Sequence, residues 1–302
     1  MKVQLKIPAT TANLGPGFDT LGLALNIANY LEVETIADGL EISVFGQGEQ
    51  ELSQDHNNLV YQGIEYVFRK LKKDVPGLKI TQRNEIPLSR GLGSSAAAIV
   101  GGLVAANELL GRPLTINQLL DTACQIEGHP DNVAPALLGG LVVSCLDNNQ
   151  VKYCNIKPAK PLDVVVVIPD FKLSTQATRA ILPEKVDFSA ATYNASRVGL
   201  LVGSFYTGDY SLLKAACKDR LHQNYRAKLI PGFNAVLDAA IEANGLAAAL
   251  SGAGPSVVAF TTDDPEKLGR AMQQAFAEHQ INSDFVITNI NNQGIEVLDS
   301  TI

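Results

Sequence analysis

Cysteine, positive charge and long apolar runs are all scarce in this chain, and each scarcity excludes a class of protein. The 302 residues include four cysteines, with no Cys-x-x-Cys pair and no Cys/His spacing typical of a zinc site. We therefore expect reduced, buried thiols and neither a disulfide framework nor a metal finger. Lys and Arg number 24 against 31 Asp and Glu, a net charge of −7, which offers no electrostatic footprint for nucleic acid. An anionic ligand has to be held by a local site.

Signals for membrane insertion or secretion are also lacking. The longest nearly apolar run, 133–146, is interrupted by Pro135 and by Gly139-Gly140 and is too short to cross a bilayer. The first six residues alternate polar and apolar, which predicts a strand and not a signal peptide. We expect a soluble, cytoplasmic protein with no membrane partner.

The chain contains enough apolar residues to form a large core. Apolar residues make up 46% and charged residues 18%, which excludes a disordered chain or a coiled coil. Alternation predicts strands over 3–7 and 40–44, and helical spacing predicts a helix over 59–71. Further strands are predicted at 78–83, 139–145, 163–169, 246–250, 257–261 and 285–288, and further helices at 94–110, 117–127, 193–206, 210–218, 232–244 and 265–279.

A change of composition divides the chain near its middle. Asn148-Asn149-Gln150 is turn-like, and residues 157–161, Lys-Pro-Ala-Lys-Pro, are typical of a linker. The sequence therefore predicts an α+β protein of two domains, residues 1–156 and 157–302.

The strongest local motif is a glycine-rich segment between a predicted strand and a predicted helix. Such a loop lets the backbone approach a phosphate closely, and the free amides and positive dipole end of the helix attract the charge. The segment reads Pro87-Leu88-Ser89-Arg90-Gly91-Leu92-Gly93-Ser94-Ser95-Ala96-Ala97.

Three other interpretations of this segment compete with that one. A Walker A loop needs a lysine after its last glycine, and Gly93 is followed by serine. A Rossmann loop fits Gly-x-Gly-x-x-Ala but needs a strand with an acidic residue about 20 positions later, where a second helix is predicted. A plain helix cap after a glycine turn is the remaining alternative.

Two other small-residue segments, residues 8–25 and residues 251–256, are expected to form loops, and each follows a predicted strand. Three such segments, widely spaced, resemble the GHMP kinase superfamily along the whole chain. The resemblance implies a two-domain GHMP kinase fold, with a ribosomal-S5-like α/β domain carrying the phosphate loop and a C-terminal ferredoxin-like α/β sandwich. Residues 87–97 would then be the ATP-phosphate loop, supported by Gly252 and Gly254.

Within that superfamily the motifs are most similar to the homoserine kinase family. Residues 8–23 contain no Lys or Arg, whereas mevalonate and galactose kinases usually carry one there. Residues 127–135, 174–183 and 224–233 are similar to that family's HxDNVAP, STxxARxxLP and PYR…PG segments. Thr178 and Asn224 depart from the usual Ala and Pro, which puts only local loop geometry in doubt.

The resemblance implies phosphoryl transfer from MgATP to the hydroxyl of L-homoserine, a step of threonine biosynthesis. It implies that Arg179 and Arg226 hold the acceptor carboxylate and Asp19 its ammonium, and that Ser95 and Glu127 contact Mg²⁺. The complete set of implied acceptor-binding residues is Asn13, Asp19, His129, Asn132, Thr175, Arg179 and Arg226. Of these, Asn13, Asn132 and Arg179 are expected to act in catalysis.

Several alternatives stay open at this stage. Asn132 stands where related kinases have a catalytic aspartate, so no general base is evident, and Asp131 is only a candidate. Another GHMP kinase of mevalonate or sugar type, or a GHMP-like sensor without turnover, would also fit the motifs. The sequence is silent on oligomeric state and leaves a homodimer open.

Overall fold

The computed structural model describes residues 1–301. The first half contains β1 (Lys2–Asn13), β2 (Gly17–Ile36), β3 (Leu40–Gly46), α1 (Leu59–Lys70), β4 (Gly77–Asn84), α2 (Ser94–Leu109), α3 (Ile116–Glu127), α4 (Pro130–Leu138), β5 (Leu141–Asp147) and β6 (Gln150–Ile156). The second half contains β7 (Asp163–Pro169), α5 (Thr175–Ala180), α6 (Phe188–Thr207), η1 (Tyr210–Leu212), α7 (Leu213–Ala216), α8 (Gln223–Arg226), η2 (Ala227–Leu229), α9 (Phe233–Glu242), β8 (Ala247–Leu250), β9 (Val257–Thr261), α10 (Pro265–Glu278), β10 (Ser283–Asn289) and β11 (Glu296–Thr301).

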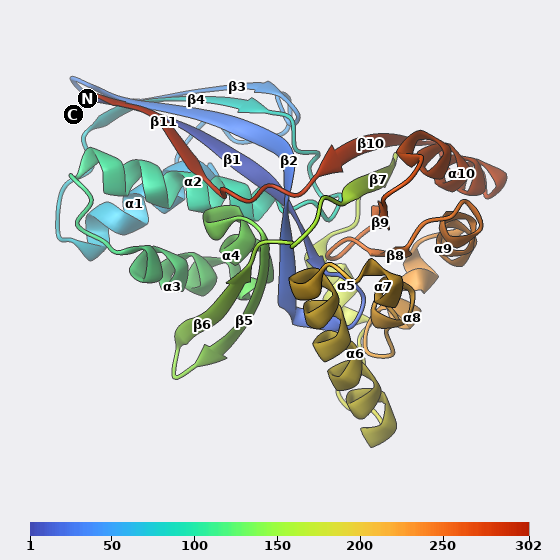
Figure 1. The fold of residues 1–302 in the computed structure, drawn as a ribbon. Coiled ribbons are helices and arrows are strands. Elements are labelled where there is room, and N and C mark those ends of the chain that lie inside the picture. The colour runs from blue at the N-terminus through green and yellow to red at the C-terminus, as the bar shows by residue number, and fades with distance from the viewer. Residues whose placement is uncertain (302) are drawn as a thin grey trace.

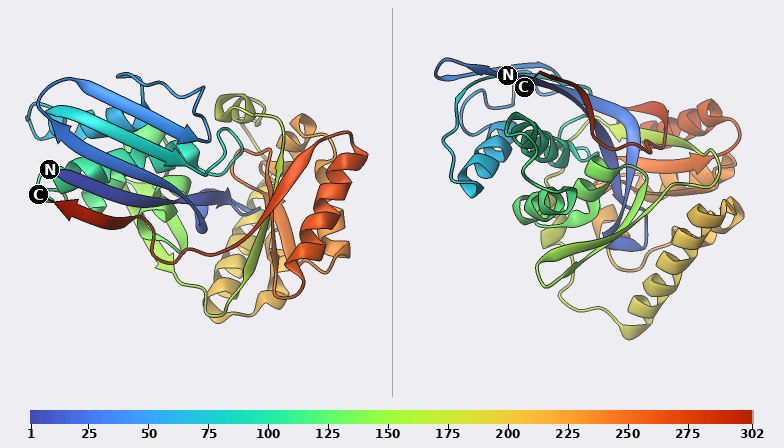
Figure 2. Two further views of the ribbon diagram at one scale, coloured as in Figure 1. Left: turned by 90° about the horizontal axis from the view of Figure 1, so that it is seen from above. Right: turned by 60° about the vertical axis from the view of Figure 1, so that its left-hand side comes forward.

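Two separate sheets organise these elements (Figure 1). Within the described residues, the first sheet runs β11-β1-β2-β4-β3 with β5 and β6 attached through β2, and the second runs β10-β7-β9-β8. The predicted α+β class is confirmed. The change of sheet falls between Ile156 and Asp163, but β11 returns from the second half to pair with β1 (Figure 2). The boundary at residue 156 therefore stays a prediction.

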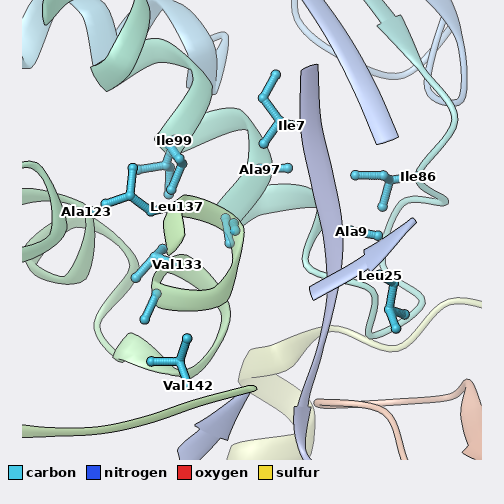
Figure 3. Close-up of a cluster of buried hydrophobic side chains, with 14 of the residues drawn as sticks. Ile7, Ala9, Leu25, Ile86, Ala97, Ile99, Ala123, Val133, Leu137 and Val142 are labelled. Atoms are coloured by element: carbon cyan, nitrogen blue, oxygen red, sulfur yellow. The ribbon is translucent and has the colours of Figure 1, made fainter. Parts of the chain in front are cut away.

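Helix α2 is the centre of the first half. It packs against β1 on one side and against α1, α3 and α4 on the others, and its apolar side chains are buried all around. A helix covered on every side can be apolar on every side, which explains its Ala-, Gly- and Val-rich sequence. Figure 3 shows Ala97 and Ile99 of this helix with Ile7 of β1 and with Val133 and Leu137 of α4.

The second sheet is covered on both faces. Val164 and Val166 of β7 share a core with Leu201 and Phe205 of α6, while Val165 packs on the other face toward α9 and α10. This burial on both sides confirms what the run of four valines predicts.

The segment 8–25, expected to be a loop, is instead part of a long two-stranded ribbon. Strands β1 and β2 pair down to Asn13, and only residues 14–16 turn. The small residues serve close packing: a side chain on Gly22 would place its Cβ 1.7 Å from the carbonyl oxygen of Asp131. The prediction was wrong because small residues were taken to indicate a loop.

The helix α4 and the strands β6 and β11 were not predicted, and neither were the short helices α5, α8 and η2. Pro135 lies inside α4, and a proline there normally argues against a helix because it removes one backbone hydrogen bond. Across residues 1–301 the structure contains no helix with the length and hydropathy of a membrane span.

The contact of α1 with α2 supplies a test of this packing. A Cβ on Gly102 would lie 2.2 Å from the carbonyl oxygen of Val60, so Gly102→Ala has to push the helices apart. We expect a loss of about 2 kcal/mol in the free energy of unfolding, measured by urea denaturation. Gly199→Ala on α6 is the matched control, because its Cβ would meet nothing. Removing that helical glycine should raise stability by up to about 1 kcal/mol. Equal effects of the two substitutions would contradict the packing argument.

Candidate functional site

A single cleft joins the glycine-rich loop to the two arginines of the second half. Its walls come from residues 88–95 of the loop, from 58–60 at the start of α1, from 127–132 around the start of α4, and from the α5 and α8 regions. Asn13 and Asp19, at the end of the β1–β2 ribbon, complete it. The cleft thus contains residues from both halves of the chain.

The glycine-rich loop ends at the N-terminus of α2 with its amides free. Gly93 caps the helix in the left-handed region (φ 70°) and contributes no side-chain hydrogen bond. Counted from the start of α2, Ala97 is the first residue whose amide has a backbone acceptor, and it donates to the carbonyl of Gly93. Among the described residues, the amides of Ser94 and Ser95 have no such partner, so the positive end of the helix faces the cleft.

The loop is held in shape by the turn at residues 251–254. The hydroxyl of Ser251 donates to the carbonyl of Gly91 at 2.7 Å, and a Cβ on Gly91 would lie 2.1 Å from the carbonyl oxygen of Ser251. Gly252 also lies close to Gly91, because a Cβ on Gly252 would lie 3.2 Å from the carbonyl oxygen of Gly91. Only glycine permits this approach at a positive φ.

Ser95 and Glu127 meet across the mouth of the cleft. The Ser95 hydroxyl donates to Oε2 of Glu127 at 2.8 Å, although the two residues belong to different helices. A hydroxyl and a carboxylate beside free helix amides are hard oxygen ligands of the kind that Mg²⁺ takes together with phosphate oxygens. The donor set therefore fits a magnesium ion.

Asp19 and Arg179 form a two-pronged ion pair on the opposite wall. Nη1 and Nη2 of Arg179 donate to the two carboxylate oxygens of Asp19 at 3.0 and 2.6 Å. This hydrogen bond raises the pKa of Arg179, while burial opposes the rise. The backbone of Asp19 has φ 53°, and its amide donates to Oδ1 of Asn13 at 3.1 Å.

Arg226 is a buried cation without a carboxylate of its own. Only 1% of the residue is exposed, and its guanidinium donates to the carbonyls of Thr178 and Gly252 and to the ring of His222. Burial, reinforced by the charge of Arg179, lowers the pKa of Arg226 to about 10. No salt bridge to Arg226 occurs within residues 1–301. A buried guanidinium that lines a cleft without an anion favours binding of an anionic ligand.

The N-terminal end of α4, from its cap residue His129 into its first turn, places three polar side chains in the same cleft. Nδ1 of His129 pairs with the buried carboxylate of Asp131. Burial lowers the pKa of His129, but the hydrogen bond and charge of Asp131 outweigh it, so the pKa is raised overall. Oδ1 of Asn132 accepts from the hydroxyl of Thr10 at 2.8 Å, and Nδ2 of Asn132 donates to Oδ1 of Asp131 at 3.3 Å.

Asp19, His129 and Asp131 bring one ligand atom each within 4.8 Å of one another, close enough for a metal ion. The atoms that would bind the metal are already engaged in hydrogen bonds, however. Both oxygens of Asp19 bond to Arg179, and Oδ1 of Asp131 bonds to His129. The neighbouring guanidinium also repels any added cation, and a divalent ion about twice as strongly as a singly charged one, so this group is poorly suited to a metal ion.

Almost every residue expected at the site lines this one cleft. Ala96 does not, because its side chain is fully buried in the core, and Pro87 also lies outside the lining. Sequence reasoning missed Phe18, whose ring lies 5.4 Å from Cζ of Arg179 and 5.2 Å from that of Arg226. It also missed His222, although this histidine lies four residues before Arg226.

Comparison with known proteins identifies the family of this chain. The GHMP kinases N terminal domain matches residues 58–140, and the GHMP kinases C terminal domain matches residues 201–278. A homoserine kinase of Carboxydothermus hydrogenoformans is 48% identical over 288 residues, covering 95% of this chain and 94% of that protein. The chain belongs to the homoserine kinase family.

Solved structures support the same assignment. The crystal structure of a homoserine kinase from Cytophaga hutchinsonii has a TM-score of 0.89 at 32% identity, over 98% of this chain and 97% of that one. A mevalonate kinase of L. major, solved with R-mevalonate, has a TM-score of 0.70 at 18% identity over 95% of each chain, and shares the fold alone. The two-domain GHMP kinase fold predicted from the motifs is confirmed, and this homoserine kinase family member is a kinase.

The contact of the loop with residue 251 gives a testable prediction. Gly91→Ala forces a Cβ against the Ser251 carbonyl and strains a positive φ, so the loop has to open. We expect ATP to lose most of its ability to raise the melting temperature, measured by differential scanning fluorimetry. Gly111→Ala is the control, since Gly111 also has a positive φ but its Cβ would meet nothing. An undiminished ATP response in Gly91→Ala would show that the loop does not hold the nucleotide.

Proposed function

We propose that this protein transfers the γ-phosphate of ATP to the side-chain hydroxyl of L-homoserine, giving O-phospho-L-homoserine and ADP. The observation that carries the proposal is the buried guanidinium of Arg226, unpaired with any carboxylate, on the wall of the same cleft as the free amides of α2. One end of the cleft suits a polyphosphate and the other a small carboxylate.

In this proposal residues 87–97 form the ATP site. The free amides of Ser94 and Ser95 donate to phosphate oxygens, and the helix dipole adds to the attraction. The apolar side chains of Leu52, Leu59 and Val60 line the cleft beyond the loop, where the nucleobase of ATP would lie. The loop does not need a lysine, because the charge is held by amides and metal.

Ser95 and Glu127 would hold Mg²⁺ beside the phosphates. The ion would neutralise phosphate charge and orient the γ-phosphate. The Ser95–Glu127 hydrogen bond of 2.8 Å shows that both oxygens already converge on one point.

The acceptor would lie between the arginines and the start of α4. Both terminal nitrogens of Arg179 bond to Asp19, so Arg226 is the main partner for the acceptor carboxylate, with Arg179 beside it. Asp19 and the other polar groups near it then receive the ammonium. Thr175 and His129 line the same part of the cleft and complete the acceptor side.

The hydroxyl would be positioned by Asn13 and Asn132. An amide side chain cannot accept a proton at neutral pH, so these residues orient the hydroxyl and do not deprotonate it. Asp131 is less suited as a base, because its Oδ1 bonds to both His129 and Asn132. Catalysis then depends on positioning and on charge neutralisation, and Arg179 adds positive charge near the transferring group.

A panel of acceptors tests the proposed function. Release of ADP is measured with L-homoserine, L-threonine, mevalonate, galactose and shikimate under the same conditions. We expect turnover with homoserine to exceed that with mevalonate by a factor of about 100 or more, since mevalonate lacks the ammonium that Asp19 would bind. Preference for another acceptor would favour a different GHMP kinase, and no turnover with any acceptor would favour a sensor.

Arg226→Ala tests the carboxylate site directly. Loss of a charge-assisted hydrogen bond should raise the homoserine KM by about 10- to 100-fold and leave the ATP KM nearly unchanged. Arg220→Ala is the matched control, because Arg220 is exposed, lies on the ring of Tyr193 and does not line the cleft. A similar rise of both KM values in Arg226→Ala would contradict the assignment.

A further inference from the structure

A histidine with no part in the proposed reaction is fully buried behind Arg226. Nε2 of His222 lies 2.8 Å from the carbonyl oxygen of Gly15, and Nδ1 lies 3.2 Å from Nη1 of Arg226. A guanidinium can only donate hydrogen bonds, so Nδ1 has to accept. The ring proton is therefore on Nε2, from which it donates to Gly15. The neutral ring satisfies both neighbours at once.

The loop that carries His222 is anchored from below by two buried side chains. Oδ2 of Asp219 accepts the amides of His222 at 2.9 Å and Gln223 at 2.7 Å at the start of α8. Oδ1 of Asp219 accepts from Nδ2 of Asn194 at 2.6 Å, and Nδ2 of Asn194 also donates to the carbonyl of Pro16 at 3.0 Å. Asp219 and Asn194 thus fix His222 and the turn at residues 14–16 to each other.

The turn itself packs directly against this loop. A Cβ on Gly15 would lie 2.0 Å from the carbonyl oxygen of Cys217, so the two backbones are in close contact. The turn separates Asn13 from Asp19, which means that its position decides where both of these acceptor-side residues lie. His222 touches the turn on one side and Arg226 on the other.

We propose that His222 is a positioning residue for the acceptor pocket: through Nδ1 it orients the Arg226 guanidinium and through Nε2–H it holds the turn that carries Asn13 and Asp19. The proposal rests on the proposed function, in which those three residues bind the acceptor. The proposal adds a residue that the acceptor does not contact. The alignment of both ends of the acceptor depends on this residue.

Burial is the main reason that this neutral form is favoured. Burial lowers the pKa of His222, and the nearby guanidinium of Arg226 lowers it further. The carboxylates of Asp219 and Asp19 act in the opposite direction without reversing the shift. The aromatic face of Phe18, with its centroid 5.3 Å from that of the His222 ring, adds no charge.

Kinetics of three substitutions test the proposal. His222→Phe keeps a ring but loses both hydrogen bonds, and should raise the homoserine KM by about tenfold or more, as expected for one lost bond to a charged group. His222→Asn keeps an acceptor near the position of Nδ1 and should restore the homoserine KM to within about threefold of the wild type. His222→Gln keeps the donor toward Gly15 but not that acceptor, and should lie between the two. The ATP KM should not change in any of them.

A matched control distinguishes the proposed positioning role of His222 from a general effect on stability. Phe205→Leu disturbs the core beneath α6 without touching the cleft, and should lower the melting temperature while leaving the homoserine KM unchanged. Long-range ¹H–¹⁵N spectra of the wild-type protein give a readout that needs no variant and no turnover. They should show His222 as the neutral Nε2–H tautomer at neutral pH.

Four results would overturn the proposal. These are a homoserine KM in His222→Phe within about twofold of the wild type, a matching rise of the ATP KM, no recovery in His222→Asn, and an Nδ1–H or doubly protonated ring in the spectra. Should His222→Phe fail to fold, the Asn and Gln variants and the spectra still decide. Failure of the proposed function would look different, because the wild-type protein itself would then not phosphorylate homoserine.

Discussion

The docking of the turn at residues 14–16 onto the second half of the chain is the contact on which the rest of the site depends. The β1–β2 ribbon leaves the first sheet and crosses to the region of α6 and α8 (Figure 1). There, carbonyls of the turn are bonded by Asn194 and His222, and Gly15 touches Cys217. The same end of the ribbon brings Asp19 within hydrogen-bond distance of Arg179, a residue of the second half.

An acidic protein that handles a polyanion has to concentrate its positive potential locally. The net charge of −7 disfavours ATP at long range, so in the proposed site the attraction would come from free amides at the start of α2 and from a few buried or paired guanidinium groups. Arg179 is neutralised by Asp19, whereas Arg226 is not. Of these two arginines, Arg226 is the one without a carboxylate partner among the described residues, which suits the proposed acceptor with its single carboxylate.

Features encoded locally could be predicted from the sequence. The loop that leads into α2 could be predicted because glycines and serines before an apolar run are a short-range signal, and the β7 strand because four consecutive valines indicate burial on both faces. The long ribbon was not found, since its small residues are explained only by distant partners, such as Asp131 beside Gly22. The ion pair of Asp19 with Arg179 spans 160 positions, and no local pattern predicts it. His222 lay next to a recognised motif, but its role depends on Gly15, more than 200 residues away.

The close approach of Gly91 to Ser251 has a consequence for the order of assembly. The strand, loop and helix of the proposed phosphate site are complete within the first 109 residues, yet the hydroxyl that holds the loop comes from residue 251. A nascent chain on the ribosome therefore carries the residues of a nucleotide site long before it can shape one. Nucleotide can stabilise this fold only after most of the polypeptide has been synthesised, so it acts on the finished protein and not as a template for its first half.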